Sequence, residues 1–313
     1  MTDARHLISI HDLTADRVRG LFDLAADVKA NPEKHESALH RKSLGMIFQK
    51  SSTRTRVSFE TGMVQLGGHA LFLSARDIQL GRGESISDTA QVLSRYVDGI
   101  MARTYAHQDV VDLARFGTIP VINGLTDELH PCQALADYFT LAEIFGGYDG
   151  LAGRKIAYVG DGNNMCHSLM LGAAKVGMDI TVACPEGYDP KPEYVDLARE
   201  DGAERGITVQ VVRDPKQAAA GASAVYTDVF ASMGQEDEAQ KRLRDFEGYM
   251  VDSEVMAAAE KDAVFLHCLP CHRGEEVSAE VADGPQSRIF DEAENRLHAQ
   301  KAIMLWAMGG VEI

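Results

Sequence analysis

Two rounds of alternating strand and helix patterns, separated by a glycine-rich segment, most strongly constrain the fold of this chain. Four glycines lie at positions 146, 147, 150 and 153 of that segment. On both sides of it, short apolar runs typical of buried strands alternate with longer runs whose apolar residues recur at helical spacing. Such alternation is typical of parallel sheets covered by helices. The sequence therefore predicts an α/β protein with two doubly wound parallel-sheet domains.

The patterns also give bounds for the elements and the domains. The expected strands are 44–48, 70–73, 99–102, 119–122, 155–159, 180–183, 208–212, 224–227 and 263–266. The expected helices are 14–30, 53–66, 87–96, 108–116, 131–145, 164–176 and 292–307. The last helix is expected to pack back on the first domain. We therefore expect one domain from residues 1–146 with the C-terminal helix 292–313, and a second from residues 147–291.

Charge and composition exclude several classes of partner. The 313 residues include 31 Lys and Arg against 47 Asp and Glu, for a formal net charge of −16, which argues against nucleic acid and anionic membranes as partners. No apolar run approaches the roughly 18 residues of a membrane span, and the first residues do not resemble a signal peptide. The five cysteines are an odd and scattered set, as expected of reduced thiols, so we expect a cytoplasmic protein.

Polar residues that follow predicted strands are the candidate site residues, because ligands of parallel sheets collect at the carboxyl ends of the strands. Ser52, Thr53, Arg54 and Thr55 follow the first strand and open a helix, whose free N–H groups and dipole favour an anion. Hydroxyl and guanidinium groups would add hydrogen bonds to a phosphate. The simpler alternative is that Ser52 only caps the helix.

Two further groups are expected to face the same crevice. Arg103 ends a predicted strand, and His130 and Gln133 stand at the start of a helix opened by Pro131. Each could be structural when considered alone. Their expected convergence with Arg54 favours a binding site.

The segment Gly160–Met165 resembles the beginning of a dinucleotide-binding motif, with Glu186 as a possible ribose ligand. Met165 takes the place of the third glycine, and the two asparagines instead offer amide groups to a small polar ligand. Asn163 could equally be a helix cap. A nicotinamide-dependent oxidoreductase remains an alternative at this point.

The segment His267–His272 contains a Cys-x-x-Cys-His pattern formed by Cys268, Cys271 and His272. Haem attachment would require export, and four possible ligands within six residues do not match the spacing of structural zinc sites. A thioredoxin-like dithiol requires a helix after the first cysteine, whereas Cys268 follows a strand. We interpret the segment as a loop that offers Cys268 to the crevice, and an anion-binding or thiol-metal protein remains the second alternative.

Three motifs together resemble the signatures of the aspartate/ornithine carbamoyltransferase family. They are Ser52-Thr53-Arg54-Thr55-Arg56, His130-Pro131-Cys132-Gln133 and His267-Cys268-Leu269-Pro270. Asp228-Val229-Phe230-Ala231-Ser232-Met233-Gly234 and Gly162-Asn163-Asn164-Met165 resemble the ornithine branch of that family. Cys271 departs from the family pattern, which more often has a small residue there.

The resemblance implies an enzyme that transfers the carbamoyl group of carbamoyl phosphate to the δ-amine of L-ornithine, giving L-citrulline and phosphate in arginine biosynthesis. It implies a carbamoyl-phosphate domain, an ornithine domain, no cofactor or metal, and a homotrimer or a multiple of trimers. The residues implied for carbamoyl phosphate are Ser52, Thr53, Arg54, Thr55, Gln79, Arg103, His130, Gln133, Cys268, Leu269 and Arg296. Those implied for ornithine are Asn164, Asp228, Ser232 and Met233, and the catalytic set is Arg54, Arg103, His130, Asp228 and Cys268.

Overall fold

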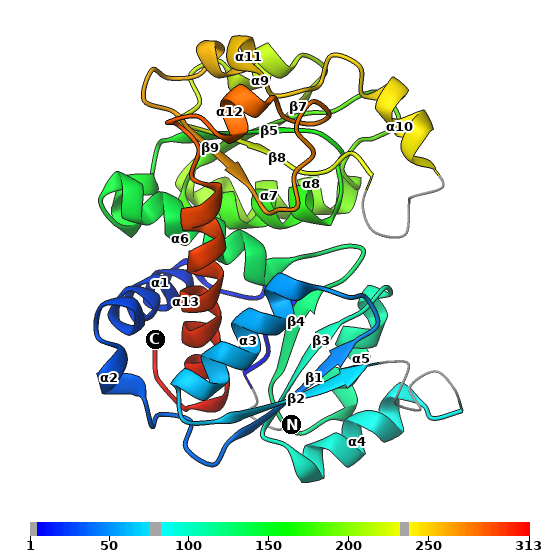
Figure 1. The fold of residues 1–313 in the computed structure, drawn as a ribbon, viewed down its shortest axis with the longest axis vertical. Coiled ribbons are helices and arrows are strands. Elements are labelled where there is room, and N and C mark those ends of the chain that lie inside the picture. The colour runs from blue at the N-terminus through cyan, green and yellow to red at the C-terminus, as the bar shows by residue number, and fades with distance from the viewer. Residues whose placement is uncertain (1–4, 75–82, 232–237) are drawn as a thin grey trace. The chain divides into compact units, whose positions relative to one another are not determined.

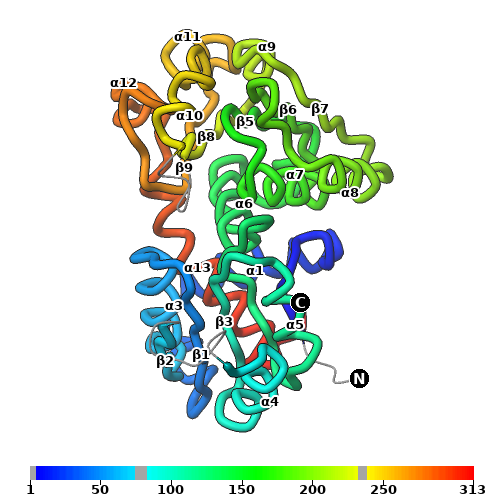
Figure 2. Tube along the Cα trace, turned by 90° about the vertical axis from the view of Figure 1, so that its right-hand side faces the viewer, coloured from blue at the N-terminus to red at the C-terminus, as the bar shows by residue number. Residues whose placement is uncertain are grey.

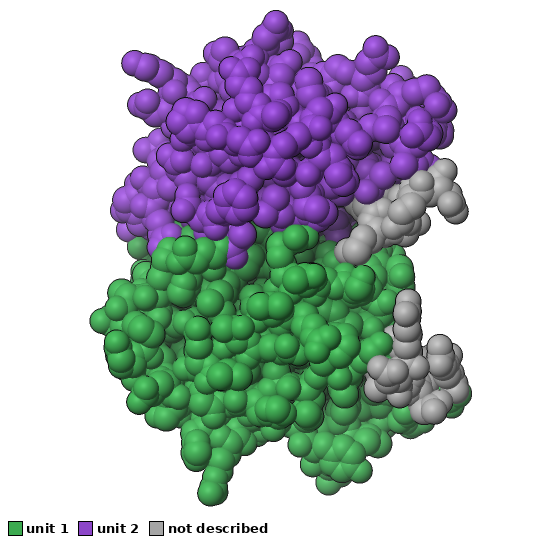
Figure 3. Space-filling view, viewed as in Figure 1, with its two compact units in different colours: residues 1–139, 294–313 green, residues 140–293 purple. Residues whose placement is uncertain are grey.

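The chain divides into two compact units. The computed structural model describes residues 5–74, 83–231 and 238–313 (Figure 1). Unit 1 comprises Met1–Phe139 with Glu294–Ile313, and unit 2 comprises Thr140–Ala293 (Figure 3). Two helices, α6 (Pro131–Phe145) and α13 (Ile289–Met308), contribute residues to both units. The units therefore divide within these helices, whereas the glycine-rich segment follows α6.

Unit 1 contains a parallel sheet of four strands in the order β2-β1-β3-β4. The strands are β1 (Ser43–Phe48), β2 (His69–Ser74), β3 (Gly99–Arg103) and β4 (Val121–Leu125). The central strands β1 and β3 are almost wholly buried, as expected of parallel strands covered on both faces. The order reverses between β1 and β3, so the loops that follow these two strands border the crevice in which such sheets bind ligands.

The helices of unit 1, apart from the short helix Pro32–His35 that was not predicted, begin and end close to where local sequence signals predict. They are α1 (Ala15–Ala30), α2 (Pro32–His35), α3 (Thr53–Gln65), α4 (Ile86–Tyr96) and α5 (His107–Phe116). Thr14, Ser52 and Ser85 cap α1, α3 and α4 with their side-chain hydroxyls. None of the described helices is long and apolar enough to cross a lipid bilayer.

Strand β4 lies two residues later than the sequence predicts. Asn123-Gly124 reads as a turn signal, yet both residues belong to the strand. The buried Asn123 side chain donates from its amide nitrogen to the carbonyl of Ile8 at 2.9 Å, inside the core. A Cβ at Gly124 would lie 2.4 Å from the sulfur of Met101, so close packing explains the glycine.

Unit 2 contains a parallel sheet of five strands in the order β7-β6-β5-β8-β9. The strands are β5 (Lys155–Val159), β6 (Asp179–Ala183), β7 (Val209–Val212), β8 (Ala224–Thr227) and β9 (Val264–His267). The order reverses between β5 and β8. The loops after these strands therefore border the crevice of the second sheet.

Helices cover both faces of this second sheet. Figures 1 and 2 show α7 (Asn164–Val176) and α8 (Pro192–Gly202) on one face, and α9 (Pro215–Ala219) and α11 (Ser253–Ala258) on the other. The remaining elements are α10 (Ala239–Asp245), α12 (Ala279–Ala282) and the short 3₁₀ helices Tyr148–Leu151 and Ala203–Arg205. The predicted fold class, two parallel-sheet α/β domains, is confirmed. Helices α8 to α12 were not among the elements that the sequence predicts.

Candidate active site

The first turn of α3 presents an anion-binding arrangement at the crevice of unit 1. Ser52 Oγ accepts the N–H of Thr55 at 3.2 Å, so this serine is a helix cap, as the simpler interpretation holds. The Ser52 hydroxyl also lies 3.1 Å from that of Thr55. Thr53 is exposed and Arg54 half-buried. The free N–H groups of this turn and the helix dipole both favour a negative charge.

Arg296 of α13 joins two other elements of unit 1. Its guanidinium is only 3 % exposed and donates to Oε1 of Gln133 on α6 and, at 3.3 Å, to the Thr55 hydroxyl on α3. Gln133 in turn donates to Asp137 at 2.7 Å. The amide oxygen of Gln300, one turn further along α13, faces the same guanidinium. These bonds fix Arg296 beside the start of α3, although the two lie far apart in the sequence.

His130 lies buried among three guanidinium groups. Burial, followed by the charges of Arg296, Arg103 and Arg54, holds the pKa of His130 well below its usual range. The imidazole is therefore neutral near pH 7, and it can donate from one ring nitrogen only. Arg103, at the end of β3, is itself 3 % exposed. The structure thus brings Arg54, Arg103 and His130 together, as the sequence predicts, and Arg296 connects Gln133 to the same cluster.

Asp228 is the central polar group in the crevice of unit 2. It follows β8 and is 7 % exposed. Its Oδ2 accepts from Nδ2 of Asn163 at 3.0 Å, and its Oδ1 accepts from the N–H of Val229 at 2.8 Å and from the thiol of Cys268 at 3.1 Å. Three donors therefore orient the carboxylate.

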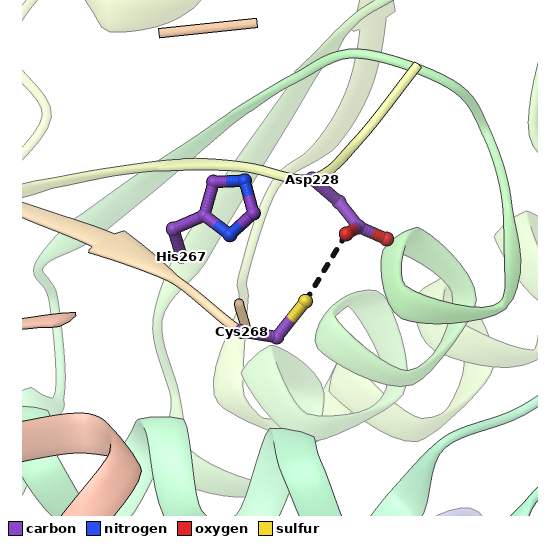
Figure 4. Close-up of side chains that lie close together, drawn as sticks. All are labelled: Asp228, His267 and Cys268. Carbon is purple, nitrogen blue, oxygen red and sulfur yellow. Dashed lines mark hydrogen bonds between the residues drawn. The ribbon is translucent and has the colours of Figure 1, made fainter. Parts of the chain in front are cut away.

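Cys268 directs its sulfur toward the carboxylate of Asp228, as Figure 4 shows. The loop that carries it is held by His267, the last residue of β9, which is completely buried. His267 Nδ1 accepts the N–H of Leu269 at 2.9 Å, and Nε2 lies 3.2 Å from Oε1 of Glu276. The acceptor role of Nδ1 places the ring proton on Nε2. Leu269 has a positive φ of 58°, so the chain turns sharply directly after the cysteine.

Asp228, His267 and Cys268 are also ligand types for a transition metal, and their ligand atoms lie within 4.8 Å of one another. Both nitrogens of His267 are already used within the loop, by Leu269 and Glu276. Cys271 is not part of this group; its sulfur lies 3.5 Å from the guanidinium of Arg273. Within the group, Cys268 is hydrogen-bonded to Asp228, whereas His267 is bonded to Leu269 and Glu276 instead.

Three implied site residues lie outside the described residues, and Asn164 lies beside a second asparagine of the crevice. Asn164 begins α7 and is half-buried, but Asn163, one residue earlier, is the residue that contacts Asp228. Gln79, Ser232 and Met233 lie outside the described residues.

Sequence reasoning missed the supporting side chains. Tyr158 on β5 donates to the carbonyl of Asp161 at 2.9 Å and lies 3.2 Å from Oδ1 of Asn163. Arg242 on α10 pairs with Asp161 at 2.7 Å and donates to the carbonyl of Phe230 at 2.9 Å. Arg242 could not be found locally because it contacts Asp161, 81 residues away, and Tyr158 stands in a predicted strand as an ordinary apolar-run residue.

Comparison with known proteins identifies the family. The model of the aspartate/ornithine carbamoyltransferase carbamoyl-P binding domain matches residues 5–143. The model of the Asp/Orn binding domain of the same family matches residues 152–307. Each model thus matches the part of the chain that contains the corresponding sheet.

Individual relatives agree with the family models. An ornithine carbamoyltransferase of Symbiobacterium thermophilum is 58% identical over 97% of this chain and 98% of its own length. One of Methanothermobacter thermautotrophicus is 55% identical over 98% of this chain and 100% of its own. The solved ornithine carbamoyltransferase of Pyrococcus furiosus matches with a TM-score of 0.94 at 51% identity, covering 99% of this chain and 98% of the other. The resemblance seen in the sequence motifs is confirmed, and this chain belongs to the aspartate/ornithine carbamoyltransferase family.

Proposed function

We propose that this protein transfers the carbamoyl group of carbamoyl phosphate to the δ-amine of L-ornithine, giving L-citrulline and phosphate. The observation that carries the proposal is the cluster of Arg54, Arg103 and Arg296 around a buried, neutral His130. Such a cluster suits a small acyl phosphate. The identity to ornithine carbamoyltransferases over nearly the whole chain supports ornithine as the acceptor.

The unit 1 residues bind and activate carbamoyl phosphate. Ser52, Thr53 and Arg54 bind the phosphate at the start of α3, where the helix dipole adds to the positive charge. Arg103, His130 and Thr55 donate to the carbonyl oxygen and stabilise its negative charge in the tetrahedral intermediate. Each such donor is typically worth a factor of about 10² to 10³ in rate.

The unit 2 residues bind and orient ornithine. The amine must be neutral to attack, because an ammonium group has no lone pair, and Asp228 and Cys268 hold it and direct it. A carboxylate with three fixed donors suits an amino group better than an acidic acceptor. The segment from Val229 to Glu236 contains no Lys or Arg that could bind a dicarboxylate acceptor.

The other residues implied by the family resemblance complete the proposed site. For carbamoyl phosphate these are Gln79, Gln133, Cys268, Leu269 and Arg296, and for ornithine they are Asn164, Ser232 and Met233. The buried hydrogen bond between Arg296 and Gln133 supports the inclusion of both.

We further propose that the protein is a homotrimer, or a multiple of trimers, that works in arginine biosynthesis in the cytoplasm. Edge strand β2 and neighbouring α3 expose Leu71, Phe72 and Val57, by 39%, 37% and 53%, which supports association through this region. That the assembly contains three copies of the chain is implied by the family resemblance. The five cysteines, all within the described residues, form no disulfide, which supports a reducing compartment.

An assay of phosphate release and of the carbamoylated product, with carbamoyl phosphate and a panel of amines, tests the proposed reaction. The panel contains ornithine, N-acetylornithine, putrescine and aspartate. N-acetylornithine is included because a solved acetylornithine transcarbamylase is 34% identical, with a TM-score of 0.87. Ornithine should give the highest kcat/KM by at least a hundredfold, whereas a preference for another amine would reassign the acceptor. Mass measurement in solution tests the trimer.

A further inference from the structure

A cavity of about 740 Å³ lies within unit 1, and none of its lining residues is among those assigned to carbamoyl phosphate. It is lined by residues of α1, α2, α3 and α13, and among them are Lys29, His298 and Lys301. These three basic side chains form a cluster, because the charges of both lysines act on His298. The proposed reaction uses none of them.

Among the residues that the structure describes, no carboxylate forms an ion pair with the buried ammonium group of Lys301. The described part of the chain buries three lysines, and two have a carboxylate: Lys50 is bonded to Asp127, and Lys175 to Asp201. Lys301 is 3% exposed, and its hydrogen bond is to the neutral amide oxygen of Gln65, at 3.0 Å. Since buried charges in proteins are normally paired, an unpaired ammonium at a cavity wall indicates a missing anion.

Two neighbours of Lys301, Lys29 and His298, line the same cavity. Lys29 donates to another neutral amide oxygen, that of Asn295, at 2.9 Å. Nδ1 of His298 is buried and has no hydrogen-bond partner among the described residues. Burial and the charges of Lys301 and Lys29 lower the pKa of His298, and Glu294, 3.5 Å from Nε2, only partly opposes them.

We propose that this cavity binds a small ligand through an anionic group, a phosphate or a carboxylate, held by Lys301 and Lys29 with His298 beside them. The rim of the cavity carries the exposed acidic side chains of Glu33 and Glu36. This acidic rim repels extended polyanions and admits a small ligand, and it suits an anion that also carries an ammonium group. The proposal does not rest on the proposed reaction.

The pKa of His298, followed by NMR and assigned with a His298→Gln variant, tests the proposal. The intact protein is titrated in phosphate, in acetate and in chloride of equal ionic strength. A bound anion favours the imidazolium form, so phosphate or acetate should raise the pKa of His298 saturably above its value in chloride. The anion that does so identifies the group that is bound.

Substitutions distinguish anion binding in this cavity from other effects of the anion on the pKa of His298. Lys301→Met should weaken the anion response at least tenfold, and Lys29→Met serves as a second variant with the same expectation. Lys34→Met is the matched control, because this exposed lysine pairs with Asp27 and does not line the cavity; it should leave the response unchanged. Arg54→Ala should also leave it unchanged.

Three results would overturn the proposal. The first is a pKa of His298 that is equal in the three salts. The second is an unweakened anion response in both the Lys301→Met and the Lys29→Met variants. The third is loss of the response in Arg54→Ala, because the anion would then be bound by the residues of the proposed active site.

Discussion

Asn163 orients the carboxylate of Asp228 and at the same time caps α7. Its Nδ2 donates to Asp228 Oδ2 at 3.0 Å, while its Oδ1 accepts the N–H groups of Met165 and Cys166 at 2.9 and 3.2 Å. One side chain thus connects the loop after β5 to the loop after β8. The cap and the contact with Asp228 can be separated by substitution.

Asn163→Ser should keep the helix cap but lose the contact with Asp228, because serine caps well and is too short to reach across. A hydrogen bond to a charged group contributes about 1.5–3 kcal/mol, so kcat/KM for ornithine should fall roughly 10- to 100-fold. The KM for carbamoyl phosphate should change little. Asn163→Ala should show the same kinetic loss and also a lower melting temperature, and full activity of the serine variant would contradict this role.

Cys268→Ala should impair the use of ornithine, because Asp228 loses the thiol donor at 3.1 Å. We expect kcat/KM for ornithine to fall about 10-fold or more, with the fold unchanged. Cys268→Ser retains a donor and should be less impaired than the alanine variant. Cys271→Ala is the matched control and should have the kinetics of the unmodified protein; an equal loss in both alanine variants would refute a special role for Cys268.

Arg103→Lys should reduce kcat although the charge is kept. The guanidinium is 3 % exposed, and a lysine cannot reproduce its planar set of donors. Loss of one donor to the developing oxyanion predicts a fall of about 10²- to 10³-fold. Arg115→Lys, on α5 of the same unit, is the control. Steady-state kinetics with a circular dichroism check of folding would decide, and unchanged kcat would remove Arg103 from the catalytic set.

Because the pKa of His130 is lowered in the folded protein, we expect the free energy of unfolding to decrease at acidic pH. In the folded protein His130 resists protonation, whereas in the unfolded chain it binds a proton below about pH 6.5. Its contribution to stability is therefore complete above pH 6.5 and is lost as the pH falls below that value, by at most about 1.4 kcal/mol per pH unit.

A His130→Gln variant isolates this contribution, because the pKa values of His6 and His298 are also lowered and remain in both proteins. Urea unfolding between pH 7.5 and 5.5 should show a steeper loss of stability in the unmodified protein than in the variant. Parallel curves would mean that His130 titrates normally.

The buried pair of Arg242 and Asp161 should respond asymmetrically to substitution. Arg242→Met leaves a carboxylate buried without its partner and should cost about 3–5 kcal/mol of unfolding free energy. Adding Asp161→Asn to Arg242→Met removes the charge and should recover part of the loss. A double variant no more stable than Arg242→Met alone would argue against the pair as the cause.

Much of the fold could be predicted because parallel sheets have strong local signals. The strand Lys155–Val159 and the helix Asn164–Val176 match their predicted bounds, since a buried apolar run and a capped helix are each encoded within a few residues. Strand order could not be predicted, because it depends on how distant strands pair. Helices such as α9, with only five residues, are too short to show a helical period.

The candidate site could be predicted only in part, for the same physical reason. Arg54 and His130 stand in recognisable motifs at element ends, and the structure brings both to one place. Arg242 was missed because its role is set by a contact with Asp161, 81 residues earlier in the sequence. Asn163 was recognised as a possible cap, but its contact with Asp228 joins positions 65 residues apart.

Helix α13 returns to the first sheet only after the chain has completed the second one, so unit 1 is not encoded by one continuous stretch of sequence. A gene fragment for residues 1–146 would lack Arg296 and the helix that carries it. A permuted fragment that begins near residue 284, runs to residue 313 and continues through a linker into residues 1–146 would instead place α13 ahead of α1 and would contain all of unit 1. Recombination that exchanged only the front half of such a gene would confront Arg296 with a new Thr55 and Gln133, so these two parts of the sequence must evolve together.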